Sequence, residues 1–310
     1  MNILIKLYPG YGVGDAVQMS SVLRHVVEAH PDWKIDYGAE EGKHQAGRGI
    51  VTNTFALGRS TPSEKYDAEI EIVLYDTYMA WTDRPNTRVT SCLHSQFGLP
   101  WKSEYARYEI NVSGDVNQQM EVAIRKFLAG GVYRQRPFKK PVALHYRGDS
   151  APLKKDLSDN QADQICDFIL ARDRTPLIID WRNTSPVSNR IDVCTTGREL
   201  FSREYGRNLE RNTALIAQCE AFIGIDSGPA KCASATNTPA LVIWTGHHPA
   251  VFHDPSPNTT HLVPNGYGMK SPVFGNIDVM NWFEDHYQYR VYETDPIAQI
   301  KRWLEEVLKK

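Results

Sequence analysis

The stretch 224–238 reads GIDSGPAKCASATNT, and it lies between the apolar runs 221–223 and 240–244. This order predicts a strand, a tight turn, a helix of small residues and a second strand. Ser227 stands at the position of a helix N-cap, and Pro229 falls in the first turn, where its missing N–H costs nothing. The stretch therefore predicts an α/β fold, because strand–helix–strand units build parallel sheets.

The turn in this stretch is also suited to an anion. Asp226 ends the first strand, and Gly228 allows a ligand to approach the backbone closely. The free N–H groups and the positive dipole end of a helix N-terminus bind phosphate groups. An ordinary strand–helix turn is the alternative, but the run Asp226-Ser227-Gly228-Pro229 favours a phosphate or pyrophosphate site.

The start of the chain predicts a second unit of the same kind. It combines an apolar strand, a glycine-rich turn, a helix with an apolar stripe and another strand, at 2–7, 8–15, 16–30 and 34–37. Gly14 and Asp15 close the turn at the carboxyl end of the first strand, where open α/β sheets place their chemistry. Asp15 is thus a candidate general base, and a simple helix cap is the alternative.

This first turn does not predict a nicotinamide cofactor. The glycines at 10, 12 and 14 lack the GxGxxG spacing of a dinucleotide site. Asp36 lies too early, and inside its strand, to be the acid that binds a ribose.

The rest of the chain continues the alternation of strands and helices. We expect strands at 50–57, 68–74, 108–112, 142–146, 177–180 and 191–194, and helices at 118–128, 158–171, 208–219 and 296–308. Residues 282–292 are aromatic and read as irregular. The basic, proline-bounded stretch 134–141 predicts a domain linker, with a nucleic-acid patch as the alternative.

Basic residues follow the expected strand 142–146 directly. The loop 147–157 contains Arg147, Lys154 and Lys155 just past the carboxyl end of that strand, which suits a diphosphate. A charged surface loop is the alternative. The second half of the chain thus contains two candidate anion-binding features, and the first half contains one isolated acid.

The composition is that of an ordinary protein of two moderate domains. Of the 310 residues, 41% are hydrophobic and 23% are charged, and the net charge of −2 does not favour nucleic acid or an anionic membrane as a partner. The five cysteines form no CxxC pair, which favours a reducing, cytoplasmic compartment over disulfides or structural zinc. We expect neither a signal peptide nor a membrane span.

Two further features bear on ligands and partners. The histidines at 247, 248 and 253 lack the other ligands of a metal site, so we expect no metal. The expected helix 296–308 is amphipathic, which predicts packing onto the protein. Peripheral association with a membrane surface is the alternative for this helix.

Several stretches together resemble the ADP-heptose:lipopolysaccharide heptosyltransferases of glycosyltransferase family 9. They are the opening ILIKLYPGYGVGDAVQMSSVLRHVVEAHPDWKIDY, the segment SCLHSQFGLPW, the strand and lysine-bearing loop at 142–157, and LIAQCEAFIGIDSGPAKCASATNTPALVIWTGHHP, which is similar to the donor-site signature of the family. The chain departs from the family pattern at Lys231, near a position where the family often has histidine. It departs again at Lys155-Asp156-Leu157, where many members have Lys-x-Trp.

The resemblance implies the GT-B architecture, in which two Rossmann-like parallel-sheet domains face each other across a cleft. It implies an acceptor-side domain at 1–137, a donor-binding domain at 138–292, and a final helix at 293–310 that crosses back to the first domain. It also implies an inverting, metal-independent transfer, without a cofactor, from a nucleoside-diphosphate sugar to an acceptor hydroxyl. An ADP-linked heptose is the expected donor.

Site residues follow from the same resemblance. Asp15 would be the base, Lys155 would meet the donor phosphates, and Asp226, Ser227 and Gly228 would hold the diphosphate end of the donor. We add Gly14, Arg147 and Lys154 to the expected donor site from their places in the first turn and the basic loop. The acceptor stays open between a glycan, a protein and a small molecule. Two alternative functions also stay open, a GT-B sugar-nucleotide epimerase or hydrolase and a catalytically silent protein that binds nucleotide sugars.

Overall fold

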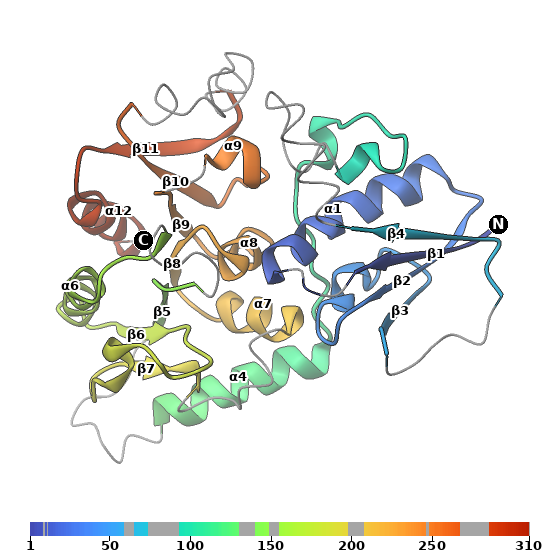
Figure 1. Cartoon of the computed structure of the whole chain (residues 1–310). Helices are drawn as coiled ribbons and strands as arrows, with labels where there is room; N and C mark the ends of the chain where they lie inside the picture. Colours follow the sequence, from blue (N-terminus) through green and yellow to red (C-terminus); the bar gives the residue numbers. More distant parts are fainter. Residues whose placement is uncertain are drawn as a thin grey trace.

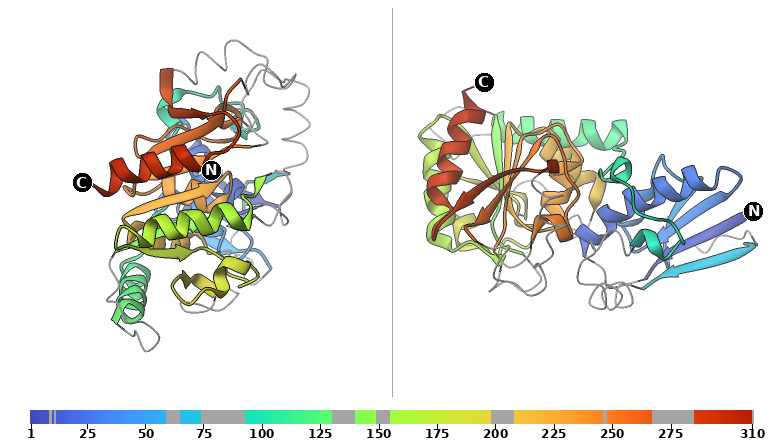
Figure 2. Two further views of the ribbon diagram at one scale, coloured as in Figure 1. Left: turned by 90° about the vertical axis from the view of Figure 1, so that its left-hand side faces the viewer. Right: turned by 90° about the horizontal axis from the view of Figure 1, so that it is seen from above.

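The computed structural model shows two α/β domains that lie side by side (Figure 1, Figure 2). It describes residues 1–8, 10, 12–58, 65–73, 93–129, 140–148, 155–197, 208–245, 248–266 and 285–309. Each domain is built on a parallel sheet, so the fold class predicted from the 224–238 stretch is confirmed.

The first domain has a four-stranded sheet in the order β3-β2-β1-β4. Its strands are β1 (Asn2–Leu7), β2 (Lys34–Ala39), β3 (Asn53–Ala56) and β4 (Ala68–Ile72), and neighbouring strands are parallel. Helix α1 (Val13–Ala29) connects β1 to β2, and its buried Val17 and Leu23 share one apolar core with Ile3 and Ile5 of β1. Two 3-10 helices, η1 (His44–Gly47) and η2 (Ser103–Tyr105), complete the described part.

The second domain has a seven-stranded parallel sheet in the order β11-β10-β9-β8-β5-β6-β7. Its strands are β5 (Pro141–His145), β6 (Thr175–Ile178), β7 (Cys194–Thr195), β8 (Ala221–Ile225), β9 (Ala240–Ile243), β10 (Thr259–Pro264) and β11 (Gln288–Tyr292). Its helices are α6 (Asp159–Leu170), η3 (Pro186–Asn189), α7 (Leu209–Ala217), α8 (Gly228–Ser234), α9 (Pro249–Phe252) and α12 (Ile297–Leu308). Helices α7 and α8 cover the face of the sheet toward the first domain, and α6 and α12 cover the opposite face (Figure 1).

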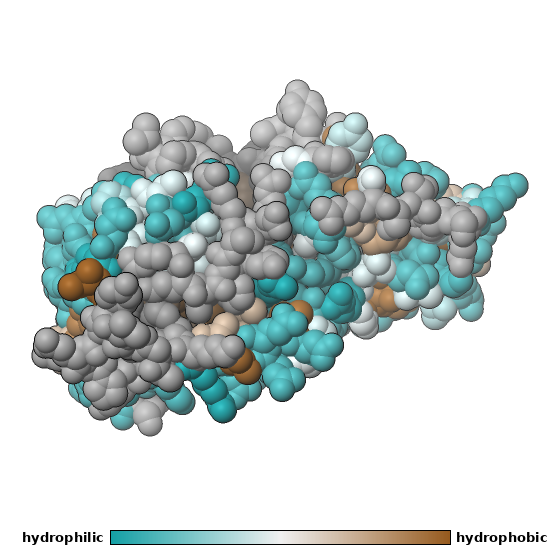
Figure 3. Space-filling view, turned by 90° about the horizontal axis from the view of Figure 1, so that it is seen from below, coloured by the Kyte–Doolittle hydropathy of each residue, from teal (hydrophilic) through white to brown (hydrophobic). Residues whose placement is uncertain are grey.

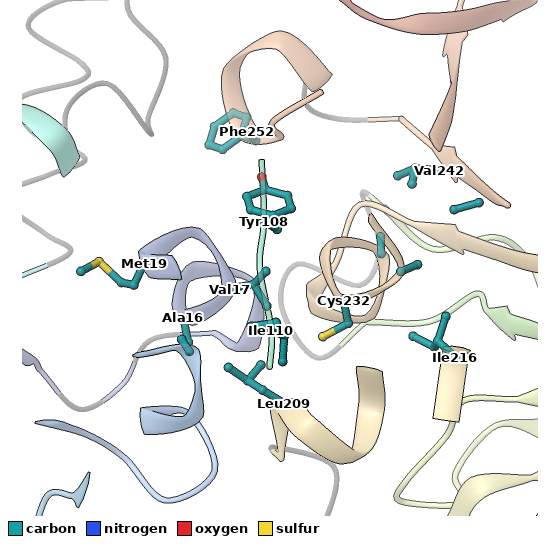
Figure 4. Close-up of a cluster of buried hydrophobic side chains, with 14 of the residues drawn as sticks. Ala16, Val17, Met19, Tyr108, Ile110, Leu209, Ile216, Cys232, Val242 and Phe252 are labelled. Atoms are coloured by element: carbon teal, nitrogen blue, oxygen red, sulfur yellow. The ribbon is translucent and has the colours of Figure 1, made fainter. Parts of the chain in front are cut away.

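One apolar core extends from the first domain into the second. Figure 4 shows Val17 of α1, Cys232 of α8 and Leu209 of α7 gathered around Tyr108 and Ile110. All five side chains are buried. Removing this apolar surface from water holds α1 against α7 and α8, and so fixes how the two domains meet.

The last helix corrects one expectation. Helix α12 packs against α6, β11 and β8 of the second domain, on the side away from the first domain (Figure 2), so the expected crossing back is wrong. Its apolar side, with Ile300 and Leu304 fully buried, fills the far face of the second sheet beside α6. That buried side is therefore not free to lie on a membrane.

A helix of the first half of the chain lies on the second domain instead. Helix α4 (Gly114–Ala129), expected at 118–128, packs against α7, and Gln218 Nε2 donates a hydrogen bond to Asn117 Oδ1 at 3.1 Å. The domain boundary expected at 137/138 and most of the expected linker 134–141 lie outside the described residues.

Three other expectations about strands are wrong. Residues 108–112 form no strand, because their backbone pairs with neither sheet. The alternating apolar side chains Tyr108 and Ile110 are buried in the core between the domains instead. The expected strand 191–194 is reduced to β7, which begins only at Cys194. The stretch 282–292, expected to be irregular, ends in strand β11 at the edge of the second sheet.

Within the ranges given above, no helix has the length and apolarity needed to cross a bilayer. The face of the molecule in Figure 3 is mostly hydrophilic where its residues are described, and apolar residues occur there in small separate groups.

Candidate active site

Two turns from opposite domains meet at the centre of the molecule. One follows β1 and opens α1 at Val13, and the other follows β8 and opens α8 at Gly228. A Cβ built on Gly228 would lie 2.6 Å from Cβ of Val13 and 3.0 Å from the backbone N of Gly14. The contact between the turns therefore requires glycine at position 228, because any side chain there would collide with Val13. This holds whether or not a ligand binds beside it.

Asp15 lies in the first turn of α1, next to this contact. Its Oδ2 accepts a hydrogen bond from the backbone N–H of Gly12 at 3.0 Å, which satisfies one free donor at the helix start. Burial raises the pKa of the Asp15 carboxyl, while the ammonium of Lys231 and the Gly12 N–H act in the opposite direction. A carboxylate with a raised pKa accepts a proton more readily than an ordinary one.

Lys155 and Asp226 form an ion pair on the donor side of the site. Lys155 Nζ donates to Asp226 Oδ2 at 3.1 Å, and both side chains are largely buried, with 16% and 10% exposed. The structure thus brings together two of the predicted site residues from the ends of two loops. It also shows that the Asp226 carboxylate is already engaged by a cation.

Ser227 differs in detail from its predicted role. It occupies the N-cap position of α8, but its side chain makes no cap hydrogen bond. Ser227 Oγ donates to the carbonyl of Ile225 at 3.0 Å, so the His145 Nδ1 that lies 3.0 Å from the same oxygen is its donor. The first N–H groups of α8 are therefore left without the side-chain cap that the sequence predicted.

The predicted basic loop reaches the site only in part. Arg147 donates to Asp159 Oδ2 at 3.1 Å, at the start of α6, and its side chain is 43% exposed. That contact turns Arg147 toward α6, so the structure does not join it to the Lys155–Asp226 pair. Lys154 lies outside the described residues.

Sequence reasoning missed Lys231 as a site residue. This lysine of α8 is only 6% exposed, and the charges that act on it include those of Asp15, Asp226 and Lys155. Its position five residues after Asp226, in a helix otherwise made of small residues and one proline, was the available signal.

Histidines near the site are buried and act as structural groups. His248 Nδ1 accepts the backbone N–H of Ala250 at 3.2 Å and caps α9, and burial lowers the pKa of His248 to about 4. His253 and His261 lie in contact with the ring of Trp244. Among the residues that the structure describes, no three His, Cys, Asp or Glu side chains are grouped to hold a metal ion.

Comparison with known proteins bears on the fold and on the segment that contains the second turn. The family model of glycosyltransferase family 9 (heptosyltransferase) matches residues 206–274, the segment that contains the Asp226–Gly228 turn. No curated protein sequence matches the chain.

Solved structures match almost the whole fold. A family 9 glycosyltransferase from Veillonella parvula has a TM-score of 0.68 at 13% identity, with 99% of this chain and 97% of that chain covered. ADP-heptose lps heptosyltransferase II of E. coli gives 0.53 at 14% identity, over 100% and 99% of the two chains. E. coli heptosyltransferase WaaC with ADP gives 0.53 at 13% identity, over 92% and 99%.

The fold is therefore the GT-B fold of glycosyltransferases, as the resemblance implied. The family model supports the resemblance to family 9 over residues 206–274, and the solved structures show the shared fold.

Proposed function

We propose that the protein transfers a sugar from a nucleoside-diphosphate sugar to an acceptor hydroxyl with inversion, and that Asp15 is the general base. The observation that carries this proposal is the contact between the two turns. It places the only carboxylate of the α1 start beside the Asp226–Gly228 turn of the other domain. One acid for the acceptor and fixed positive charge for the leaving group are what the reaction requires.

The transfer is a single displacement at the anomeric carbon. The acceptor oxygen forms its bond to that carbon on the face opposite the diphosphate, and its proton passes to Asp15. The bond between the anomeric carbon and the phosphate oxygen breaks, and its electron pair leaves with the nucleoside diphosphate. Asp15 ends the step neutral, which its raised pKa favours.

The donor diphosphate would bind at Lys155 and at the backbone N–H groups of the 226–228 turn. Helix α8 has only seven residues, so we assign most of the attraction to the lysine charge and little to the helix dipole. A carboxylate repels a diphosphate, so we assign Asp226 the task of orienting Lys155 through their 3.1 Å contact. Gly14 contributes backbone only, at the contact with Gly228.

An ADP-linked sugar is the donor that we propose, with heptose as the first candidate. The support is the resemblance to family 9 and the fold shared with a heptosyltransferase whose structure contains ADP. The described cysteines are all free thiols, which supports a cytoplasmic site of action.

Ligand binding followed by turnover tests this function. ADP-, UDP-, GDP- and TDP-sugars are compared by thermal shift, since a ligand that binds only the folded state raises the melting temperature. Nucleoside diphosphate release is then measured with and without candidate acceptor hydroxyls. We expect stabilisation by ADP-sugars and acceptor-dependent release of ADP. Release without acceptor would make the protein a hydrolase, and binding without any release would make it a silent nucleotide-sugar-binding protein.

A further inference from the structure

Lys231 reaches across the contact between the two domains. It is the fourth residue of α8, and its Cδ lies 3.4 Å from the place that a Cβ on Gly14 would occupy. Gly14 directly precedes Asp15 in α1. The side chain of Lys231 therefore extends from the donor-side helix to the turn that holds the proposed base.

The ammonium of Lys231 has no direct partner among the residues that the structure describes. A side chain that is 6% exposed loses most of its hydration, so an unpaired charge there is costly. Burial lowers the pKa of the Lys231 ammonium. The charges of Asp15 in α1, Asp226 after β8 and Asp254 after α9 oppose this change and favour the ammonium, while Lys155 acts with burial.

Among the charges that act on Lys231, that of Asp15 has the largest effect. Asp226, in contrast, is already engaged by Lys155 at 3.1 Å. The Asp15 carboxylate accepts one hydrogen bond within the described ranges, from the Gly12 N–H. For Asp15 in turn, Lys231 is the leading opposite charge, followed by the like charge of Asp226 and the opposite charge of Lys155.

We propose that Lys231 is a positioning residue that favours the carboxylate form of Asp15 and leaves Oδ1, the oxygen that does not accept the Gly12 N–H, free for the acceptor hydroxyl. This inference rests on the proposed function. A direct ion pair would occupy the proton-accepting oxygen, whereas a buried ammonium that acts without a hydrogen bond stabilises the charge alone. Without Lys231, the pKa of the Asp15 carboxyl would rise further, because the leading opposite charge is removed.

The position of Lys231 also suits the movement of charge in the reaction. Negative charge leaves Asp15 as the acceptor proton arrives, and it develops on the diphosphate beside Lys155 and Asp226. Lys231 faces both ends of this path, so it has an opposite charge beside it before and after the transfer. The lysine therefore need not be rehydrated or move during the step.

The test follows the titration of Asp15 directly in protein without donor. Aspartate labelled with ¹³C at the carboxyl group is incorporated, and the Asp15 signal is assigned from its loss in D15N. Two neutral variants, K231M and K231Q, are compared with K231R, which retains the charge. K43M is the matched control, because Lys43 is also buried but is paired with Glu40 in the first domain.

We expect the Asp15 midpoint to move to higher pH in K231M and K231Q and to stay in place in K231R and K43M. In turnover with an ADP-sugar, kcat/KM at pH 6 should fall about tenfold in the neutral variants and recover as the pH rises. An unmoved Asp15 midpoint in folded K231M or K231Q overturns the inference, as does a rise in donor KM of equal size at every pH. If the midpoint moves but no sugar is transferred by the wild type, the coupling stands and the proposed function fails.

Discussion

Gly228 of the second domain is in direct contact with Val13 of the first. The 2.6 Å between Cβ of Val13 and a Cβ built on Gly228 is shorter than any real contact of that kind. This single relationship joins the start of α8 to the start of α1, and it brings the donor turn to the proposed base. The catalytic arrangement therefore depends on how closely two backbones approach.

Substitution of Gly228 should separate the two turns. G228A should lower the free energy of unfolding by about 1–3 kcal/mol, as overpacking of a filled interface does, and G228V by more. Urea unfolding measures this, and G114A is the control, because no atom lies within 4 Å of a Cβ on Gly114. In G228A combined with V13G, part of the loss should return. Full stability in G228V would show that the turns are not in contact.

Because of the same contact, a loss of donor binding in G228V would have two possible causes. The valine side chain could push the two turns apart, or it could block the approach of the donor phosphate. G228V by itself therefore does not test the donor site. Lys155 and Asp226 offer a cleaner test, because removing their charges leaves the contact between the turns in place.

Breaking the Lys155–Asp226 pair should cost more stability than removing both of its charges. K155M leaves the Asp226 carboxylate, 10% exposed, without its cation, and a loss of about 3–5 kcal/mol is typical for a broken buried pair. K155M/D226N should regain most of that loss but not the affinity for an ADP-sugar, because the cation for the diphosphate is still missing. Thermal unfolding and donor titration give both readouts. If the double variant bound the donor with wild-type affinity, Lys155 would not be part of the donor site.

The units that lie together in the sequence could be predicted. The stretch 224–238 contains a strand end, a turn and a helix between two apolar runs, and β8, α8 and β9 form in this order at 221–243. Asp15 and Asp226 were identified because each follows a strand of a parallel sheet, and open α/β sheets place their chemistry at the carboxyl ends of such strands. Both features depend on residues that are close in the chain.

What could not be predicted depends on contacts between distant segments. Lysine is among the residue types least often buried, so Lys231 reads as a surface residue until Gly14 of the other domain is seen to cover it. Tyr108 and Ile110 alternate as in a strand, but the space between the domains buries them. The apolar side of α12 fits either domain by pattern alone, and the far face of the second sheet takes it.

Buried histidines should make the protein sensitive to acid. Burial lowers the pKa of His248 to about 4, so between pH 6.5 and 4 the unfolded state binds a proton that the folded state does not. Stability therefore falls as the pH falls through this range, by about 3 kcal/mol for this one group. H248N retains an acceptor for the Ala250 N–H but cannot be protonated. Urea unfolding at pH 7.5 and pH 5 should show a smaller acid loss in H248N, and an equal loss would assign the sensitivity to other groups such as His261.

The Asp15→Asn variant separates a base from a helix cap. Asparagine can still accept the Gly12 N–H, so the loss of stability should not exceed about 1 kcal/mol. Removing the charge of Asp15 should itself raise the stability of the folded protein. Because burial raises the pKa of Asp15, the folded state holds its proton more tightly than the unfolded state, and the ionised group costs stability once the pH rises above that pKa.

D15N removes this cost together with the proton acceptor. Turnover should fall by roughly 10²–10⁴, the usual effect of losing a general base, while affinity for an ADP-sugar stays near that of the wild type, because Lys155 and the 226–228 turn belong to the other domain. Three measurements on the one variant decide the matter: unfolding in urea at neutral pH, donor affinity, and kcat. Asp15 would be only a cap if D15N were unstable and its folded fraction turned over substrate at the normal rate.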